Sequence, residues 1–231
     1  MRLVWLFDID GTLLLTDGAA REAFALAVER RFPGREPLGD VAFAGRVDPL
    51  ILRDILDRHG ATFGAEEEAE FWDTVLLNMR RGLVPGRGCL LPGVREVLSA
   101  VDQEPGWVSA LLTGNMTQMA RIKLGHFDLA DRFAFGAFGE EAEDRNALAR
   151  VAVARAMARF GVPAERCIVV GDTEHDIACA RAAGARVVAV ATGTQSAAML
   201  ARHAPDLLLD DLRDVEGLMT WARAVAGPNG A

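Results

Sequence analysis

The most constraining feature of this sequence is a short apolar run near its beginning that ends in two aspartates. Residues 4–7, Val-Trp-Leu-Phe, are followed by Asp8, Ile9, Asp10 and Gly11. A run without polar alternation is typical of a strand buried on both faces, as in a parallel sheet. Because alternate residues of an extended chain point the same way, Asp8 and Asp10 would share one side of the strand end. Two carboxylates this close favour a nearby cation or a shared proton, although an ordinary polar turn is the simpler alternative.

From residue 91 onward the chain alternates between apolar runs and amphipathic segments. We expect strands at residues 107–112, 133–138, 167–170, 186–191 and 207–209, and helices at 94–101, 117–127, 145–160 and 176–183. Strands that alternate with helices imply right-handed crossovers and a parallel sheet. The predicted fold class is therefore α/β, with a doubly wound, Rossmann-like parallel sheet as its core, in which ligands bind beyond the carboxyl ends of the strands. The last few residues, from about Gly227, are expected to be disordered.

The chain changes character between the first strand and this alternating region. Amphipathic helices are expected at residues 19–32, 50–59 and 66–81, and no convincing buried strand separates them. The Gly/Pro-rich segment 84–88 closes the region and suits a hinge between domains. We therefore expect residues 16–88, called here the helical insertion, to form a second domain. Residues 1–15 and 89–231 would form the catalytic core.

Composition limits the classes of function. The chain is 51% hydrophobic and 25% charged, which is normal for a soluble globular protein, and its net charge of -8 argues against nucleic acid as a partner. The three cysteines, Cys89, Cys167 and Cys179, are too far apart for a metal-ligand motif or a disulfide framework. No basic-then-apolar leader and no membrane-length apolar stretch is present, so we expect a cytoplasmic protein without a membrane partner, as a monomer or homodimer.

Polar groups follow the strand expected at residues 107–112. Thr113 supplies a hydroxyl, and Gly114 and Asn115 supply backbone and amide donors just before a helix. The start of a helix that carries such donors is a favourable place for an anion. Thr113 alone would be an ordinary turn residue.

Two more carboxylates follow the strand expected at residues 167–170. Asp172 comes directly after Gly171, and Asp176 lies four residues further along. Together with the first pair they would supply the oxygen ligands that Mg²⁺ prefers. Asp176 alone could be a helix-capping residue. Three strand ends that carry complementary groups in order favour a common site over coincidence.

These motifs resemble those of the haloacid dehalogenase superfamily. Its phosphatases carry Asp-x-Asp-Gly-Thr after the first strand, a Ser/Thr strand end, a Lys/Arg, and Gly-Asp-x-x-x-Asp. Residues 7–13 and 169–176, the latter followed by Ala-Arg-Ala-Ala-Gly at 180–184, match in order and spacing. The resemblance covers essentially the whole chain. The helical insertion looks like the cap of the phosphoglycolate phosphatase-like branch.

The resemblance implies a role for each matching residue. Asp8 would be the nucleophile that forms an aspartyl phosphate, and Asp10 the general acid and then the general base. Mg²⁺ would be bound by the Asp8 carboxylate, the Asp10 carbonyl and Asp172, with Asp176 as a ligand or beside one. Thr113 and the backbone N–H groups near it would hold the phosphoryl oxygens. The substrate would be a small phosphorylated metabolite, similar to phosphoglycolate or a sugar phosphate.

One element departs from the family pattern, because the usual Lys-Pro before the last motif is missing. Arg145 lies near that place, at the start of a predicted helix, and is the favoured phosphate-site cation. Lys123 is the alternative. It follows Thr113 by ten residues on a predicted helix, about 15 Å along the axis at 1.5 Å per residue, so we expect a solvated helix residue there.

The sequence leaves several functions open for this site. A phosphomutase of the same fold would use the same residues, and a 2-haloacid dehalogenase would use the same nucleophile but typically lacks the second aspartate, which is present here as Asp10. A binding or scaffold protein would be expected to have lost Asp8, Asp10 or Asp172. In the helical insertion, Arg46 is the candidate for substrate specificity, with a solvated arginine in a turn as an equal alternative.

Overall fold

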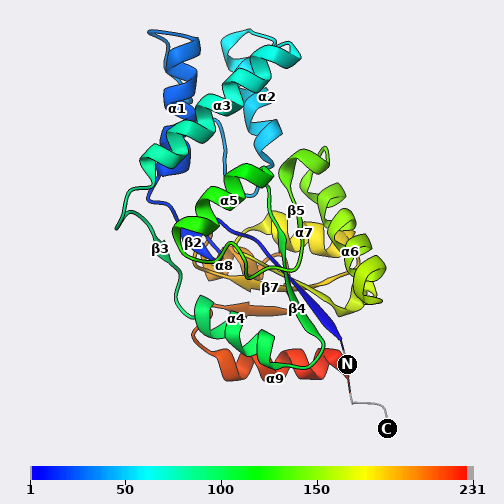
Figure 1. The fold of residues 1–231 in the computed structure, drawn as a ribbon. Helices are drawn as coiled ribbons and strands as arrows, with labels where there is room; N and C mark the ends of the chain where they lie inside the picture. The colour runs from blue at the N-terminus through cyan, green and yellow to red at the C-terminus, as the bar shows by residue number, and fades with distance from the viewer. Residues whose placement is uncertain (1, 228–231) are drawn as a thin grey trace.

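The computed structural model describes residues 2–227, and a six-stranded parallel sheet lies at its centre (Figure 1). In spatial order the strands are β5 (Gly136–Ala137), β4 (Trp107–Leu112), β1 (Leu3–Phe7), β6 (Cys167–Gly171), β7 (Arg186–Val190) and β8 (Leu207–Leu209). All five pairings are parallel. The chain builds outward from β1 to one side and then returns to the other side at β6. The ligand site of such a sheet lies where the order reverses, here between β1 and β6.

Both faces of β1 are buried, as the apolar run predicts. Leu3, Trp5 and Phe7 pack on one face with α4 (Val94–Gln103), α5 (Thr117–His126) and α9 (Val215–Ala226). Val4 and Leu6 pack on the other face with α6 (Arg145–Phe160) and α7 (Glu174–Ala182). This three-layer arrangement confirms the expected α/β class and doubly wound sheet.

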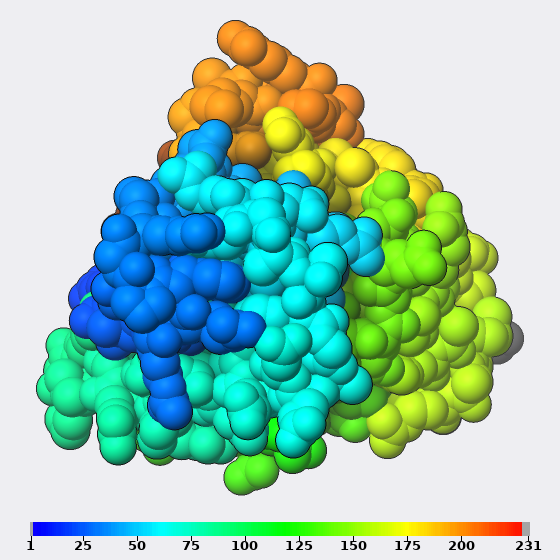
Figure 2. Space-filling model, turned by 90° about the horizontal axis from the view of Figure 1, so that it is seen from above, coloured from blue at the N-terminus to red at the C-terminus, as the bar shows by residue number. Residues whose placement is uncertain are grey.

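The helical insertion lies above the carboxyl ends of the strands (Figure 1). It contains α1 (Ala19–Arg31), α2 (Asp48–His59) and α3 (Ala65–Gly82). These helices share an apolar cluster of their own, which includes Phe24, Ile55 and Trp72. Figure 2, a view from above, shows the insertion as the blue and cyan surface over this end of the molecule.

A small ribbon connects the insertion to the sheet. β2 (Leu14–Leu15) and β3 (Cys89–Leu90) pair antiparallel at the two points where the chain enters and leaves the insertion. The sequence does not predict these strands, because two residues are too few to show an alternating pattern.

The other differences are confined to short elements and to the end of the chain. The strand expected at 133–138 is limited to β5. The short helices η1 (Gly139–Glu141), η2 (Ala164–Arg166) and α8 (Ala197–Ala201), and the longer α9, were not predicted. The expected disorder after Gly227 concerns residues 228–231, which lie outside the described part. Between residues 2 and 227, none of the helices combines the length and apolar character needed to cross a membrane.

Candidate active site

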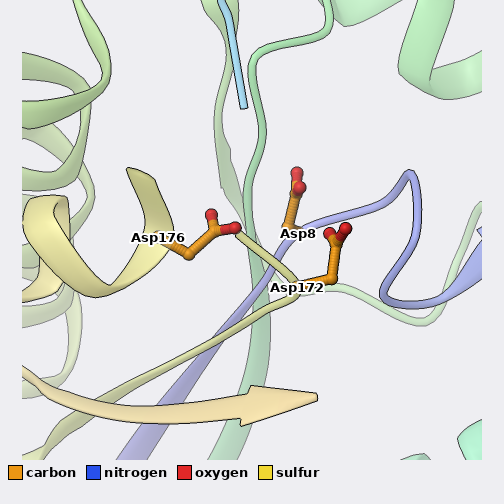
Figure 3. Close-up of side chains that lie close together, drawn as sticks. All are labelled: Asp8, Asp172 and Asp176. Carbon is orange, nitrogen blue, oxygen red and sulfur yellow. The ribbon is translucent and has the colours of Figure 1, made fainter. Parts of the chain in front are cut away.

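Three buried carboxylates meet at the carboxyl ends of β1 and β6. Asp8 follows β1, Asp172 follows β6, and Asp176 lies in the first turn of α7. Each offers an oxygen atom, and these atoms lie within 4.8 Å of one another. Figure 3 shows Asp8 and Asp172 side by side, with Asp176 reaching toward them from its helix. The neighbouring parallel strands therefore bring together residues that are more than 160 positions apart in the sequence.

The electrostatics of this cluster favour a bound cation. Burial raises the pKa of Asp8 to about 6, although the Arg145 guanidinium lowers it. Burial, and next the Asp176 carboxylate, raise the pKa of Asp172 to about 8. The protein alone therefore disfavours full ionisation of the cluster, and a divalent cation would offset the repulsion. Three oxygen donors within one small space suit a hard cation such as Mg²⁺, so the residues present fit the expected metal.

Local structure fixes the positions of these carboxylates. Asp176 accepts hydrogen bonds from the backbone N–H of Thr173 at 3.0 Å and from its hydroxyl at 2.7 Å, so it completes a capping box whose N-cap residue is Thr173. Thr12 donates to Asp172 at 3.2 Å. Gly11 has a φ of 78°, and a Cβ there would overlap the Asp172 carboxylate. The glycine of the first motif is therefore required both by the turn and by the close approach of β6.

Arg145, the favoured candidate for the phosphate-site cation, lies beside the cluster. It is the first residue of α6, and its Nη2 lies 3.2 Å from Asp8 Oδ1 and pairs with Asp176. Burial alone would lower the pKa of Arg145, but Asp8 and Asp176 raise it well above its ordinary value. Among the described residues its buried Nε–H has no acceptor. A buried donor without a partner next to Asp8 is suited to an anionic ligand.

The prediction that Lys123 is a solvated helix residue is wrong. Its side chain is buried, and Nζ lies 2.7 Å and 2.6 Å from the two carboxylate oxygens of Asp10 and 2.6 Å from Asn115 Oδ1. The estimate of its distance from Thr113 assumed one straight helix axis. The chain instead turns at Asn115 and Met116 before α5 begins, and a long helical side chain points back toward the N-terminus of its helix. Lys123 and Arg145 are therefore both in the site.

Asn115 connects Asp10 to the end of β4. Its amide Nδ2 donates to Asp10 Oδ2 and to Thr113 Oγ1, both at 2.8 Å. Thr113 is fully buried, whereas Gly114 and Asn115 line the cavity above Asp8. The Asp10 carboxylate is therefore held by Lys123 and Asn115, apart from the three-carboxylate cluster.

Asp48 is a site residue that the sequence did not indicate. It begins α2 in the helical insertion, yet its Oδ2 accepts from the Met116 backbone N–H, and its own N–H donates to the Gly114 carbonyl, both at 2.8 Å. Burial raises the pKa of Asp48 to about 7; Lys123 lowers it, and Asp10 and Glu140 raise it. The only sequence signal is an aspartate before a proline at a helix start, which does not distinguish a buried carboxylate from an exposed one.

Arg46 lines the same cavity from the insertion. Its Nη2 lies 2.6 Å from Asp54 Oδ2, so the guanidinium is paired within the insertion. The backbone of Arg46 packs so closely on Gly114 that a Cβ there would overlap the Arg46 carbonyl. The insertion therefore closes directly on the turn that follows β4 and leaves a cavity of about 410 Å³ over Asp8.

The fold is a doubly wound α/β sheet with three buried carboxylates at its strand ends, and comparison with known proteins shows its family. Residues 4–184 match the family model of haloacid dehalogenase-like hydrolases. The chain therefore belongs to the haloacid dehalogenase-like hydrolase family. The expected class of enzyme, a phosphoric monoester hydrolase of this family, is confirmed with it.

Individual proteins place the chain more closely within this family. It is 26% identical over 235 residues to a phosphoglycolate phosphatase of Pseudomonas fluorescens, covering 100% of this chain and 84% of that protein. It is 28% identical over 211 residues to a phosphoglycolate phosphatase of Pseudomonas savastanoi, covering 90% and 76%. A crystal structure of a predicted phosphoglycolate phosphatase from Haemophilus somnus superposes with a TM-score of 0.73 at 21% identity, covering 95% of this chain and 98% of that one. The resemblance to this branch of the family is confirmed.

Proposed function

We propose that this protein is a Mg²⁺-dependent phosphatase that hydrolyses a small phosphate monoester through an aspartyl phosphate on Asp8. The observation that carries the proposal is the buried cluster of Asp8, Asp172 and Asp176, with the Asp10 carboxylate held beside it by Lys123. The names of the relatives make phosphoglycolate the first ester to assay and sugar phosphates the second.

Asp8 is the proposed nucleophile, and its surroundings suit that role. Its carboxylate lies at the bottom of the cavity and faces Arg145, whose unpaired Nε–H is available for a phosphoryl oxygen. The backbone of Gly114 and the Thr113 hydroxyl are the other proposed phosphoryl contacts. Phosphoryl transfer depends mainly on positioning and on neutralising charge, so these few groups are sufficient.

Asp10 is the proposed general acid for the leaving alcohol and the general base for the water that follows. Its side chain is 42% exposed and lines the cavity, where a leaving oxygen would emerge. Lys123 and Asn115 fix the direction of its carboxylate through three hydrogen bonds. We assign these two residues the role of positioning Asp10 rather than of contacting the phosphoryl group.

The proposed metal site consists of the Asp8 and Asp172 carboxylates and the Asp10 carbonyl. Asp176 is paired with Arg145 and capped by Thr173, so we place it beside the metal as the group that fixes both neighbours. When bound, the cation would neutralise phosphoryl charge and bring the nucleophile and the ester together.

The helical insertion, residues 16–88, is the proposed substrate-binding cap on a core of residues 1–15 and 89–231. The β2–β3 ribbon at its two connections suits a hinge, and the contacts of Asp48 with Gly114 and Met116 suit a closed state. Closure would exclude bulk water from Asp8 during transfer. Arg46 stays a candidate for contact with the leaving group.

The test is to measure the products of the purified protein with Mg²⁺. A phosphatase releases inorganic phosphate from small esters, and this release stops when a chelator removes the metal. Isomerisation of a sugar phosphate without net phosphate release would indicate a mutase, and chloride release from a 2-chloroacid would indicate a dehalogenase. Full phosphate release in excess chelator would contradict the metal dependence.

A further inference from the structure

The cavity above Asp8 has a polar end and an apolar end. Its polar end contains the carboxylates and residues 192–194, which pass beside Gly11 and Asp172. The cavity has a volume of about 410 Å³, which is in the size range of sites for drug-sized ligands. This volume is larger than a phosphoryl group on a two-carbon acid requires. The rest of its wall is built mainly from seven apolar side chains: Leu15, Ala20, Phe24, Phe43, Ala44, Ile51 and Met119.

The apolar wall comes mainly from the helical insertion and is well ordered by its own packing. Phe24 lies on α1, Ile51 on α2, and Phe43 in the loop between these helices. The rings of Phe24 and Phe43 meet edge to face, with centroids 5.3 Å apart and planes at 89°. The Arg21 guanidinium lies over the Phe43 ring, 5.0 Å from its centroid, so a further ring can pack only on the parts of the pair that face the cavity.

Each cation of the cavity wall already has at least one acceptor, although Arg46 and Arg145 each keep a buried Nε–H without one in the described part of the chain. Within residues 2–227, four cations line the cavity. Arg21 donates to two backbone carbonyls of the loop before α2, at 2.9 Å and 3.2 Å, and Arg46 pairs with Asp54 at 2.6 Å. Lys123 and Arg145 contact the site carboxylates. A carboxylate or second phosphate on the leaving group would therefore compete with these acceptors for the same guanidinium and ammonium groups.

The remaining titratable group at the insertion side of the cavity is Asp48, a carboxyl group that offers no positive charge to an anionic leaving group. Hydroxyl groups of a sugar would face Phe24, Phe43 and Ile51 without hydrogen-bond partners, which opposes binding. An apolar group would instead gain from leaving water.

Resting on the proposed phosphatase activity, we infer that the substrate is the phosphate monoester of a primary alcohol with an apolar, ring-bearing body. The ester phosphoryl group lies at Asp8 and Arg145, and the ring lies against Phe24 and Phe43. This substrate class differs from phosphoglycolate and from sugar phosphates, whose leaving groups are charged or rich in hydroxyl groups.

The test compares 2-phenylethyl phosphate, ethyl phosphate, phosphoglycolate and glycerol 3-phosphate as substrates of the full chain with Mg²⁺. All four are alkyl esters, so their leaving groups differ little in chemical reactivity and the comparison reports recognition. We expect kcat/KM for 2-phenylethyl phosphate to exceed each of the others at least about tenfold, the scale by which apolar pockets discriminate. A higher kcat/KM for phosphoglycolate or glycerol phosphate would overturn the inference and leave the phosphatase proposal intact. Release of phosphate from none of the four would overturn both.

Variants of the wall provide a second test. Phe43→Ala should lower the ratio of kcat/KM for 2-phenylethyl phosphate over ethyl phosphate about tenfold, and Phe43→Leu should restore part of it. Phe63→Ala is the matched control, because Phe63 lies in the same insertion, stacks on Phe32 at 6.2 Å and is not part of the cavity wall. An unchanged ratio in Phe43→Ala, or an equal fall in Phe63→Ala, would overturn the assignment of the apolar wall.

Discussion

Lys123→Met gives the sharpest test of how the site is organised, because it removes a buried charge and keeps the length of the side chain. Lys123 is 3% exposed, and its Nζ makes two hydrogen bonds to Asp10 and one to Asn115. Hydrogen bonds to charged groups contribute about 1.5–3 kcal/mol. Since the Asp10 side chain is 42% exposed, solvent screening reduces this value. We expect Lys123→Met to lose about 2 kcal/mol of transition-state stabilisation.

The lost free energy should lower kcat more than it raises KM. At 1.36 kcal/mol per factor of ten, about 2 kcal/mol corresponds to a fall of about 30-fold in kcat. KM should change little, because the proposed task of Lys123 is to orient Asp10 and not to bind the ester. The assay is steady-state phosphate release from an alkyl phosphate, with denaturant unfolding to confirm that the variant is folded.

Two further measurements separate positioning from a general structural effect. The loss in kcat/KM should be smaller with an activated aryl phosphate, whose leaving group needs less protonation by Asp10. Arg121→Met is the matched control, because Arg121 is exposed on the same helix and lines a different pocket, and it should leave the kinetics unchanged. An unchanged kcat in Lys123→Met, or an equal loss with alkyl and aryl esters, would show that Lys123 does not act by positioning Asp10.

Substitutions of Arg145 and Asp48 should change activity and stability, respectively. Arg145→Ala should lower kcat/KM by at least about a hundredfold, because it leaves two buried carboxylates without their cation and removes a phosphoryl contact; activity close to that of the parent would contradict this. Asp48 has a pKa raised by burial from 3.8 to about 7, so its ionised form costs stability above pH 7, and this cost disappears as the pH falls through 7 toward 4. Asp48→Asn should therefore lose less stability than the parent between pH 5 and about pH 8, by about 2.5 kcal/mol in denaturant unfolding; parallel pH profiles would show that Asp48 carries no such cost.

The sequence predicts best those features that follow from strand ends. Asp8 and Asp172 each come directly after a buried run, and parallel strands place such residues at one edge of the sheet whatever the loops do. The bounds of β4, β8 and α6 were also predicted as the structure has them. These elements have strong local signals, either an uninterrupted apolar run or an amphipathic period with a capping residue.

The features that were missed depend on tertiary contacts. Lys123 reaches Asp10 because of the turn before α5, whose direction no local pattern encodes. Asp48 is buried only because the helical insertion closes on Gly114 and Met116, which are more than 60 residues away. The apolar wall of the cavity likewise arises where Phe24, from one insertion helix, meets the loop that carries Phe43. A helical period predicts which residues are apolar but not whether they face a core or a ligand.

Transfer of the phosphoryl group through Asp8 can be observed by rapid acid quench followed by peptide mass spectrometry. The Asp10→Asn variant should be used with excess ester and Mg²⁺, because loss of the general base should slow breakdown of the intermediate. We expect the quenched protein to carry one acid-stable, base-labile phosphoryl group on the peptide that contains residues 3–12, at Asp8, and none in an Asp8→Asn control. Phosphorylation at another residue, or turnover by the Asp8→Asn protein at the parent rate, would show that Asp8 is not the nucleophile.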